Sequence, residues 1–84
     1  MISKSEKKRI KKIIGHRYVG PTQTELKERN EFNKQGETYS SGHITNVMNG
    51  EPHSIIEAAI FSVVQKSIAE KEELAKQRQA LLNT

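Results

Sequence analysis

Apolar residues recur at helical spacing in several segments of the 84-residue chain. In residues 4–14 three isoleucines are spaced i, i+3 and i+4 among lysines, which predicts a short amphipathic helix with one buried stripe. Ser3 or Ser5 is placed to cap the start of this helix, and Gly15 is placed to end it.

A second helix is predicted by a Thr-x-x-Glu pattern from Thr22 to Glu25, which has the form of a capping box. The helix should therefore begin at Thr22, run through Leu26 towards Phe32, and stop near Gly36. A polar loop should follow it.

The third predicted helix covers residues 40–49 and carries no lysine or arginine. Ser40 is suited to cap its first turn, and Ile44 and Val47 form its buried stripe. Gly50 is suited to the left-handed conformation that commonly ends a helix. A neutral helix is therefore expected in the middle of a basic chain.

The last predicted helix starts at Ser54 or Ile55 and is long. Its first part has a broad apolar face that must be buried, made of Ile55, Ile56, Ala59, Ile60, Val63, Val64 and Ile68. Beyond residue 69 apolar residues become sparse. Ile60, Val64, Leu74 and Leu81 fit one heptad register, in which Lys71 and Arg78 fall at core positions. The pattern leaves two interpretations open, a dimerising arm and a solvated helix.

No segment has the alternation typical of a strand, so we expect an all-α fold of four to five small helices with a long C-terminal helix. Residues 1–66 should form one domain, and residues 67–84 a helical extension. Hydrophobic residues make up 33% of the chain and aromatic residues 5%, so the core must be small.

Charge is distributed unevenly along the chain. Residues 1–36 contain ten Lys and Arg against four Glu, whereas residues 37–84 contain four against six. A basic half predicts an anionic partner, although a lysine-rich surface also serves solubility. There is no cysteine, no apolar run of about 18 residues and no signal-peptide pattern, so we expect a cytoplasmic protein without membrane contact.

The order of these elements resembles the helix-turn-helix domain of the Xre family, which includes the lambda repressor and Cro. The resemblance covers about residues 5–66, and the sequence departs from the tight family motif by having 18 positions between Thr22 and Ser40. It implies a DNA-binding fold. The matching residues are Thr22, Gln23, Leu26, Tyr39, Ser40, Ile44, Val47 and Gly50.

An α-helix fits the major groove and reads bases with its exposed side chains, mainly near its N-terminus. On helix 40–49 the candidates for base contacts are Ser41, Gly42, His43, Thr45 and Asn46. Asparagine can bind adenine through two hydrogen bonds, and a missing side chain at a glycine allows close approach. The candidates for phosphate contacts are Lys8, Arg9, Lys12, Arg17, Thr22, Gln23, Ser40 and Asn49.

These patterns predict sequence-specific binding of double-stranded DNA by a small transcriptional regulator of repressor type, of phage or mobile-element origin. Pairing through residues 54–82 would give a homodimer on a two-fold site. The alternative is a protein-interaction module that keeps the helix-turn-helix scaffold and assembles through the C-terminal helix. The three histidines are scattered and no nucleophile–base pair is evident, so we expect no enzyme, metal or cofactor.

Overall fold

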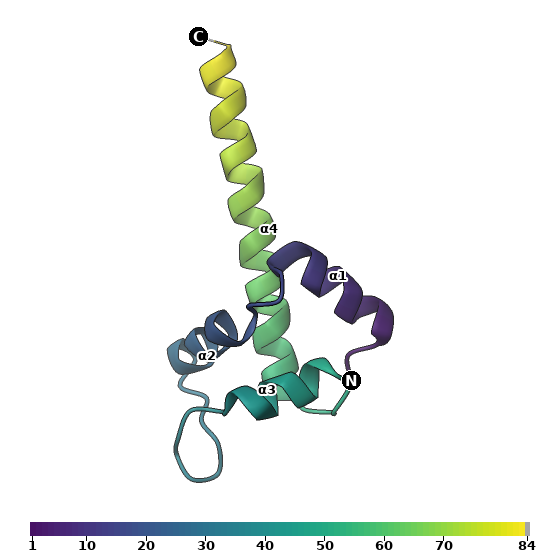
Figure 1. Ribbon diagram of the computed structural model, residues 1–84. Coiled ribbons are helices and arrows are strands. Elements are labelled where there is room, and N and C mark those ends of the chain that lie inside the picture. The colour runs from purple at the N-terminus through teal and green to yellow at the C-terminus, as the bar shows by residue number, and fades with distance from the viewer. Residues whose placement is uncertain (84) are drawn as a thin grey trace.

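Four α-helices make up the fold of residues 1–83, the part of the chain that the computed structural model describes (Figure 1). Thr84, the last residue of the predicted extension, lies outside the described residues. The prediction of an all-α fold with a long C-terminal helix is confirmed. The helices are α1 (Lys4–Ile14), α2 (Val19–Glu28), α3 (Ser41–Met48) and α4 (Ser54–Leu82).

Helix α1 has the bounds that its isoleucine pattern predicts. Ser3 caps it in a capping box, because its Oγ accepts from the N–H of Glu6 at 3.1 Å and its own N–H donates to Glu6 Oε1 at 3.0 Å. The N–H of Gly15 closes the other end by donating to the carbonyl of Lys11 at 2.8 Å.

The predicted start of the second helix is wrong. Helix α2 begins three residues earlier, at Val19, and Thr22 lies inside it with its N–H and Oγ1 both donating to the carbonyl of Tyr18. Pro21 is accommodated because the first turn of a helix leaves its N–H groups without helical partners, so the missing donor costs nothing there. The Thr-x-x-Glu pattern is therefore not a capping box.

The predicted end of the second helix is also wrong, because α2 stops at Glu28 rather than near Gly36. Asn30 adopts a left-handed conformation with φ of 57°, and its N–H donates to the carbonyl of Lys27. The N–H of Glu31 donates to the carbonyl of Leu26, which completes a Schellman motif with asparagine in the usual place of glycine. Residues 29–40 then form a long loop.

The core lies around the first half of α4, which packs against α1, α2 and α3. Ile56, Ala59 and Ile60 are completely buried there. Sequence reasoning missed two contributors, Ile2 and Tyr39, since both lie outside the predicted helices. The other buried apolar residues are Ile10, Tyr18, Leu26, Ile44, Val47, Met48 and Val64.

The second half of α4 leaves the body as an arm, which we define as residues 69–82. All of its residues are exposed, and Figure 1 shows it leading away from the end of the molecule where α3 lies. Ile60 and Val64, half of the predicted heptad register, are buried inside the domain. The inner face of residues 54–68 is thus used by the chain's own core, and what remains exposed for the predicted dimer is the arm together with Ile55 and Phe61.

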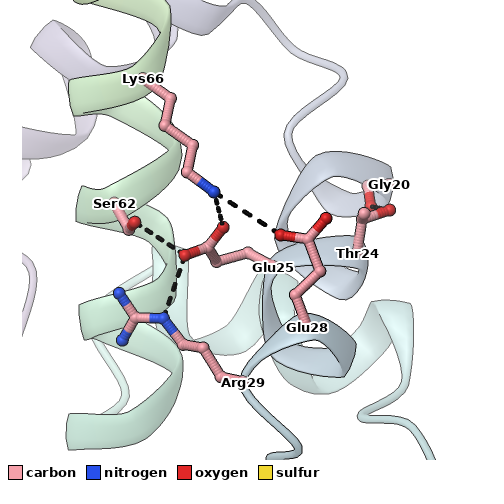
Figure 2. A network of polar contacts seen from close by, with 7 residues as sticks. All are labelled: Gly20, Thr24, Glu25, Glu28, Arg29, Ser62 and Lys66. Atoms are coloured by element: carbon pink, nitrogen blue, oxygen red, sulfur yellow. Dashed lines mark hydrogen bonds and ion pairs between the residues drawn. The ribbon is translucent and has the colours of Figure 1, made fainter.

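A buried carboxylate joins α2 to α4 (Figure 2). One oxygen of Glu25 accepts from Lys66 Nζ at 2.6 Å, and the other accepts from Ser62 Oγ at 2.8 Å and Arg29 Nε at 3.0 Å. Glu28 lies at the edge of this network, 3.6 Å from the same lysine and largely exposed. Each oxygen of the buried carboxylate therefore has a charged or hydroxyl donor.

These contacts favour the ionised form of Glu25. The Lys66 ammonium, followed by the Ser62 hydroxyl and the Arg29 guanidinium, lowers the pKa of Glu25 to about 2 against the opposing effect of burial. Since this pKa is below the ordinary value of 4.5, the network stabilises the fold above pH 4.5, and that contribution is lost as the pH falls towards 2.

We expect Glu25→Gln to lower the free energy of unfolding at pH 7 by about 1–3 kcal/mol, because the buried side chain that accepts hydrogen bonds from two cations loses its charge. The effect is limited to this size because Lys66 and Arg29 are half-exposed and can be solvated by water. The difference in the free energy of unfolding between wild type and Glu25→Gln should become smaller as the pH falls from 4.5 towards 2. Urea unfolding followed by circular dichroism at a series of pH values measures both effects.

Glu28→Gln is the matched control, since it removes the same charge from the same helix at an exposed position. It should change the free energy of unfolding by less than about 0.5 kcal/mol. Equal effects of the two substitutions would show that the buried network contributes nothing beyond net charge.

Candidate nucleic-acid interface

Helix α3 is fixed at both ends by local hydrogen bonds. Ser40 caps it as predicted, with its Oγ accepting from the N–H of His43 at 3.1 Å. At the other end Gly50, with φ of 111°, donates its N–H to the carbonyl of Val47, and Glu51 donates to that of Asn46. A two-turn helix would not persist alone, so these ends and the packing beneath it determine its shape.

The buried side of α3 consists of Ile44, Val47 and Met48, which are completely buried. The opposite side is exposed and uncharged, and we call it the outer face of α3: Ser41, Gly42, Thr45, Asn46 and Asn49. Thr45 is half-buried, and its Oγ1 donates to the carbonyl of Ser41 at 2.8 Å. The amide of Asn46 is exposed, with both a donor and an acceptor available for the edge of a base.

Gly42 is not required by the fold. A Cβ placed on it would meet open space, and its backbone does not have the positive φ that favours glycine. Glycine inside a helix costs about 1 kcal/mol relative to alanine. Gly42 therefore lowers the stability of α3, although neither a neighbouring atom nor the backbone conformation requires a glycine there.

His43, predicted to contact bases, is half-buried and turned towards two other rings. Its ring lies 5.5 Å from that of Tyr39 and 5.0 Å from that of His53, and all three pairs are edge-to-face. His53 also caps α4, because its Nδ1 accepts from the N–H of Ile56 at 3.2 Å. This ring cluster removes His43 from the outer face and joins the start of α3 to the start of α4.

Two of the predicted phosphate contacts have internal roles. Thr22 is completely buried and both of its donors are used within α2, so this prediction is corrected. Gln23 is half-buried, and its Nε2 donates to the carbonyl of Tyr39 at 3.1 Å. It therefore joins α2 to the residue just before the cap of α3 and sets where the outer face of α3 lies.

One basic residue of α1 lies at the edge of the outer face of α3. Lys7 on α1 donates to Oδ1 of Asn49, which places the N-terminal half of α1 beside the end of α3. The exposed phosphate candidates elsewhere in the body are Lys8, Arg9 and Lys12 on α1, Arg17 in the following connector, and Ser40 at the cap of α3.

Within residues 1–83 no three His, Cys, Asp or Glu side chains are grouped so that they could hold a metal ion, even though the fold brings His43 and His53 together. None of the described helices is both long and apolar enough to cross a bilayer.

A scan of protein-family models and searches of curated proteins and of solved structures found no match to this chain. The resemblance to the Xre family therefore rests on the order of sequence features, and the structure adds its own departure, a twelve-residue loop between α2 and α3.

We expect Gly42→Ala to raise the free energy of unfolding by about 0.5–1 kcal/mol, because alanine is the better helix former and its methyl group meets open space. Thermal or urea unfolding measures the change. Gly50→Ala is the contrasting variant, since its φ of 111° disfavours a side chain, and it should destabilise the protein. A destabilised Gly42→Ala protein would mean that the fold itself needs glycine there.

Proposed function

We propose that the protein binds double-stranded DNA sequence-specifically, with α3 in the major groove, as a small transcriptional regulator of repressor type. The observation that carries the proposal is the outer face of α3, which is exposed, uncharged and rich in hydrogen-bonding groups on a helix held rigidly at both ends. Asn46 is the best placed of its residues for adenine, and Ser41 for several bases.

Affinity in this proposal comes from cations around that face. Lys7 lies at the end of α3, and the exposed cations of α1 and Arg17 are within the same body. Contacts to phosphates fix the position of a protein on the duplex without reading its sequence, so a neutral reading helix and a basic surround are complementary. Gly42 fits this scheme because its missing side chain lets the backbone approach the groove.

The arm suits a dimer that leaves the outer face of α3 free. It leads away from α3 (Figure 1), and Leu74 and Leu82 on it are at least half-exposed. Pairing of two arms would present two reading helices to one duplex, as a two-fold site requires. The proposal includes such a homodimer, formed through the arm rather than through the buried part of residues 54–82.

Selection of bound duplexes from a random pool at physiological salt tests the proposal, using wild type and Asn46→Ala. Wild type should enrich a motif, and Asn46→Ala should lose about 1–3 kcal/mol of discrimination at one or two positions of it. Gly42→Ala should bind the enriched duplex more weakly although it is the more stable protein. Thr24→Ala, an exposed polar change on α2, is the matched control and should leave the motif unchanged.

A wild-type protein that enriches no motif would refute sequence-specific binding. An unchanged preference in Asn46→Ala would instead remove α3 from the role of reading helix.

The exposed arm also favours a second candidate, a protein-interaction module on the same scaffold. Salt separates the two candidates. Contacts to phosphates weaken steeply between about 0.05 and 0.2 M salt, whereas a complex built on leucine contacts should survive 0.5 M salt.

A further inference from the structure

A hollow of about 520 Å³ lies beside the first turn of α3. The 29–40 loop forms one side of it, with Asn33, Lys34 and Gln35, and the ring cluster of Tyr39, His43 and His53 forms the other. The loop connecting α2 to α3 extends past the start of α3 in Figure 1. The 29–40 loop thus lies next to the first turn of α3, and the hollow is between them.

The loop side of this hollow has a defined shape. Oδ1 of Asn33 accepts from the N–H groups of Gln35 and Glu37, both at 3.0 Å. The N–H of Asn33 donates to the carbonyl of Glu37, and that of Gly36 to the carbonyl of Asn33, both at 2.9 Å. These four bonds close a tight turn that holds Lys34 and Gln35 at its exposed tip.

The polar side chains that line the hollow, beside the apolar Ile55, have one chemistry in common. None of the residues that line it is acidic, and each polar one carries at least one N–H or O–H donor. Lys34 supplies a permanent positive charge. An anion with several acceptor oxygens, which means a phosphate group, is the ligand that this set of donors fits.

We propose that this hollow receives a backbone phosphate of the duplex whose major groove α3 enters, with Lys34 as its cationic contact. The inference rests on the proposed function and extends it to the loop that lengthens the helix-turn-helix. It places one phosphate contact at the N-terminal side of α3, the side from which such a helix reads bases. The loop is then a second positioning element for DNA.

Lys34→Ala tests this contact, with Lys76→Ala on the arm as the matched control, since both remove one exposed lysine. Loss of one phosphate contact should weaken binding about 5-fold at 0.15 M salt and reduce the slope of log K against log salt by about 0.9. The effect should be the same for enriched and scrambled duplexes. Fluorescence anisotropy measures it, and unfolding curves of both variants should match that of wild type.

Duplexes with single methylphosphonate substitutions locate the contact. One substitution beside the base pairs read by the start of α3 should weaken wild type and have no further effect on Lys34→Ala. If wild type enriches a motif but Lys34→Ala behaves like Lys76→Ala, this inference is overturned while the proposed function stands. If wild type enriches no motif, both are overturned.

Inorganic phosphate is the second probe. Saturable binding of free phosphate that Lys34→Ala abolishes, together with an unchanged affinity of that variant for the duplex, would assign the hollow to a free anion and overturn the duplex assignment.

Discussion

The packing of three short helices against the first half of α4 is the constraint on which the rest of the structure depends. Helices α1, α2 and α3 have 11, 10 and 8 residues, lengths at which isolated helices are at best marginal in water. They persist because Ile56, Ala59 and Ile60 of α4 give them one shared core. The Glu25 network fixes α2 on α4, and Gln23 continues this restraint to Tyr39, the residue before the cap of α3.

This arrangement explains how a small, uncharged helix can have a function in a basic chain. In the proposed function, attraction to DNA comes from the cations of α1 and the loops, because the outer face of α3 carries no charge. The contribution of α3 is a set of hydrogen-bonding groups in a defined position, because its caps, the ring cluster and the core beneath it fix the helix. Hydrogen-bonding groups held in a fixed position can discriminate between bases, whereas contacts of lysines to phosphates carry no sequence information.

Local patterns predicted α1 and α3, because a serine cap, a glycine end and an apolar stripe are all read within a few residues, and they predicted the long last helix from its apolar stripe. They failed for α2, where Glu25 looked like the second half of a capping box. Besides Arg29, its real partners are Ser62 and Lys66, which are 37 and 41 residues away, and no local pattern contains these two.

The outer face of α3 was largely predictable from helical periodicity, since Ser41, Gly42 and Asn46 are exposed as expected. The position of His43 was not, because it depends on rings that come from Tyr39 before the cap of α3 and from His53 at the start of α4. The hollow beside the 29–40 loop could not be predicted from the sequence either, since the turn at Asn33 can be recognised only when the end of α2 is known.

The most direct test of the central claim, that the outer face of α3 reads bases, is a nuclear magnetic resonance contact map of the protein on its best duplex. The account predicts nuclear Overhauser contacts from the side-chain amide of Asn46 and the Cα protons of Gly42 to base protons in the major groove, with no base contacts from α1. Contacts confined to lysine side chains and sugar protons, with α3 facing solvent, would contradict it.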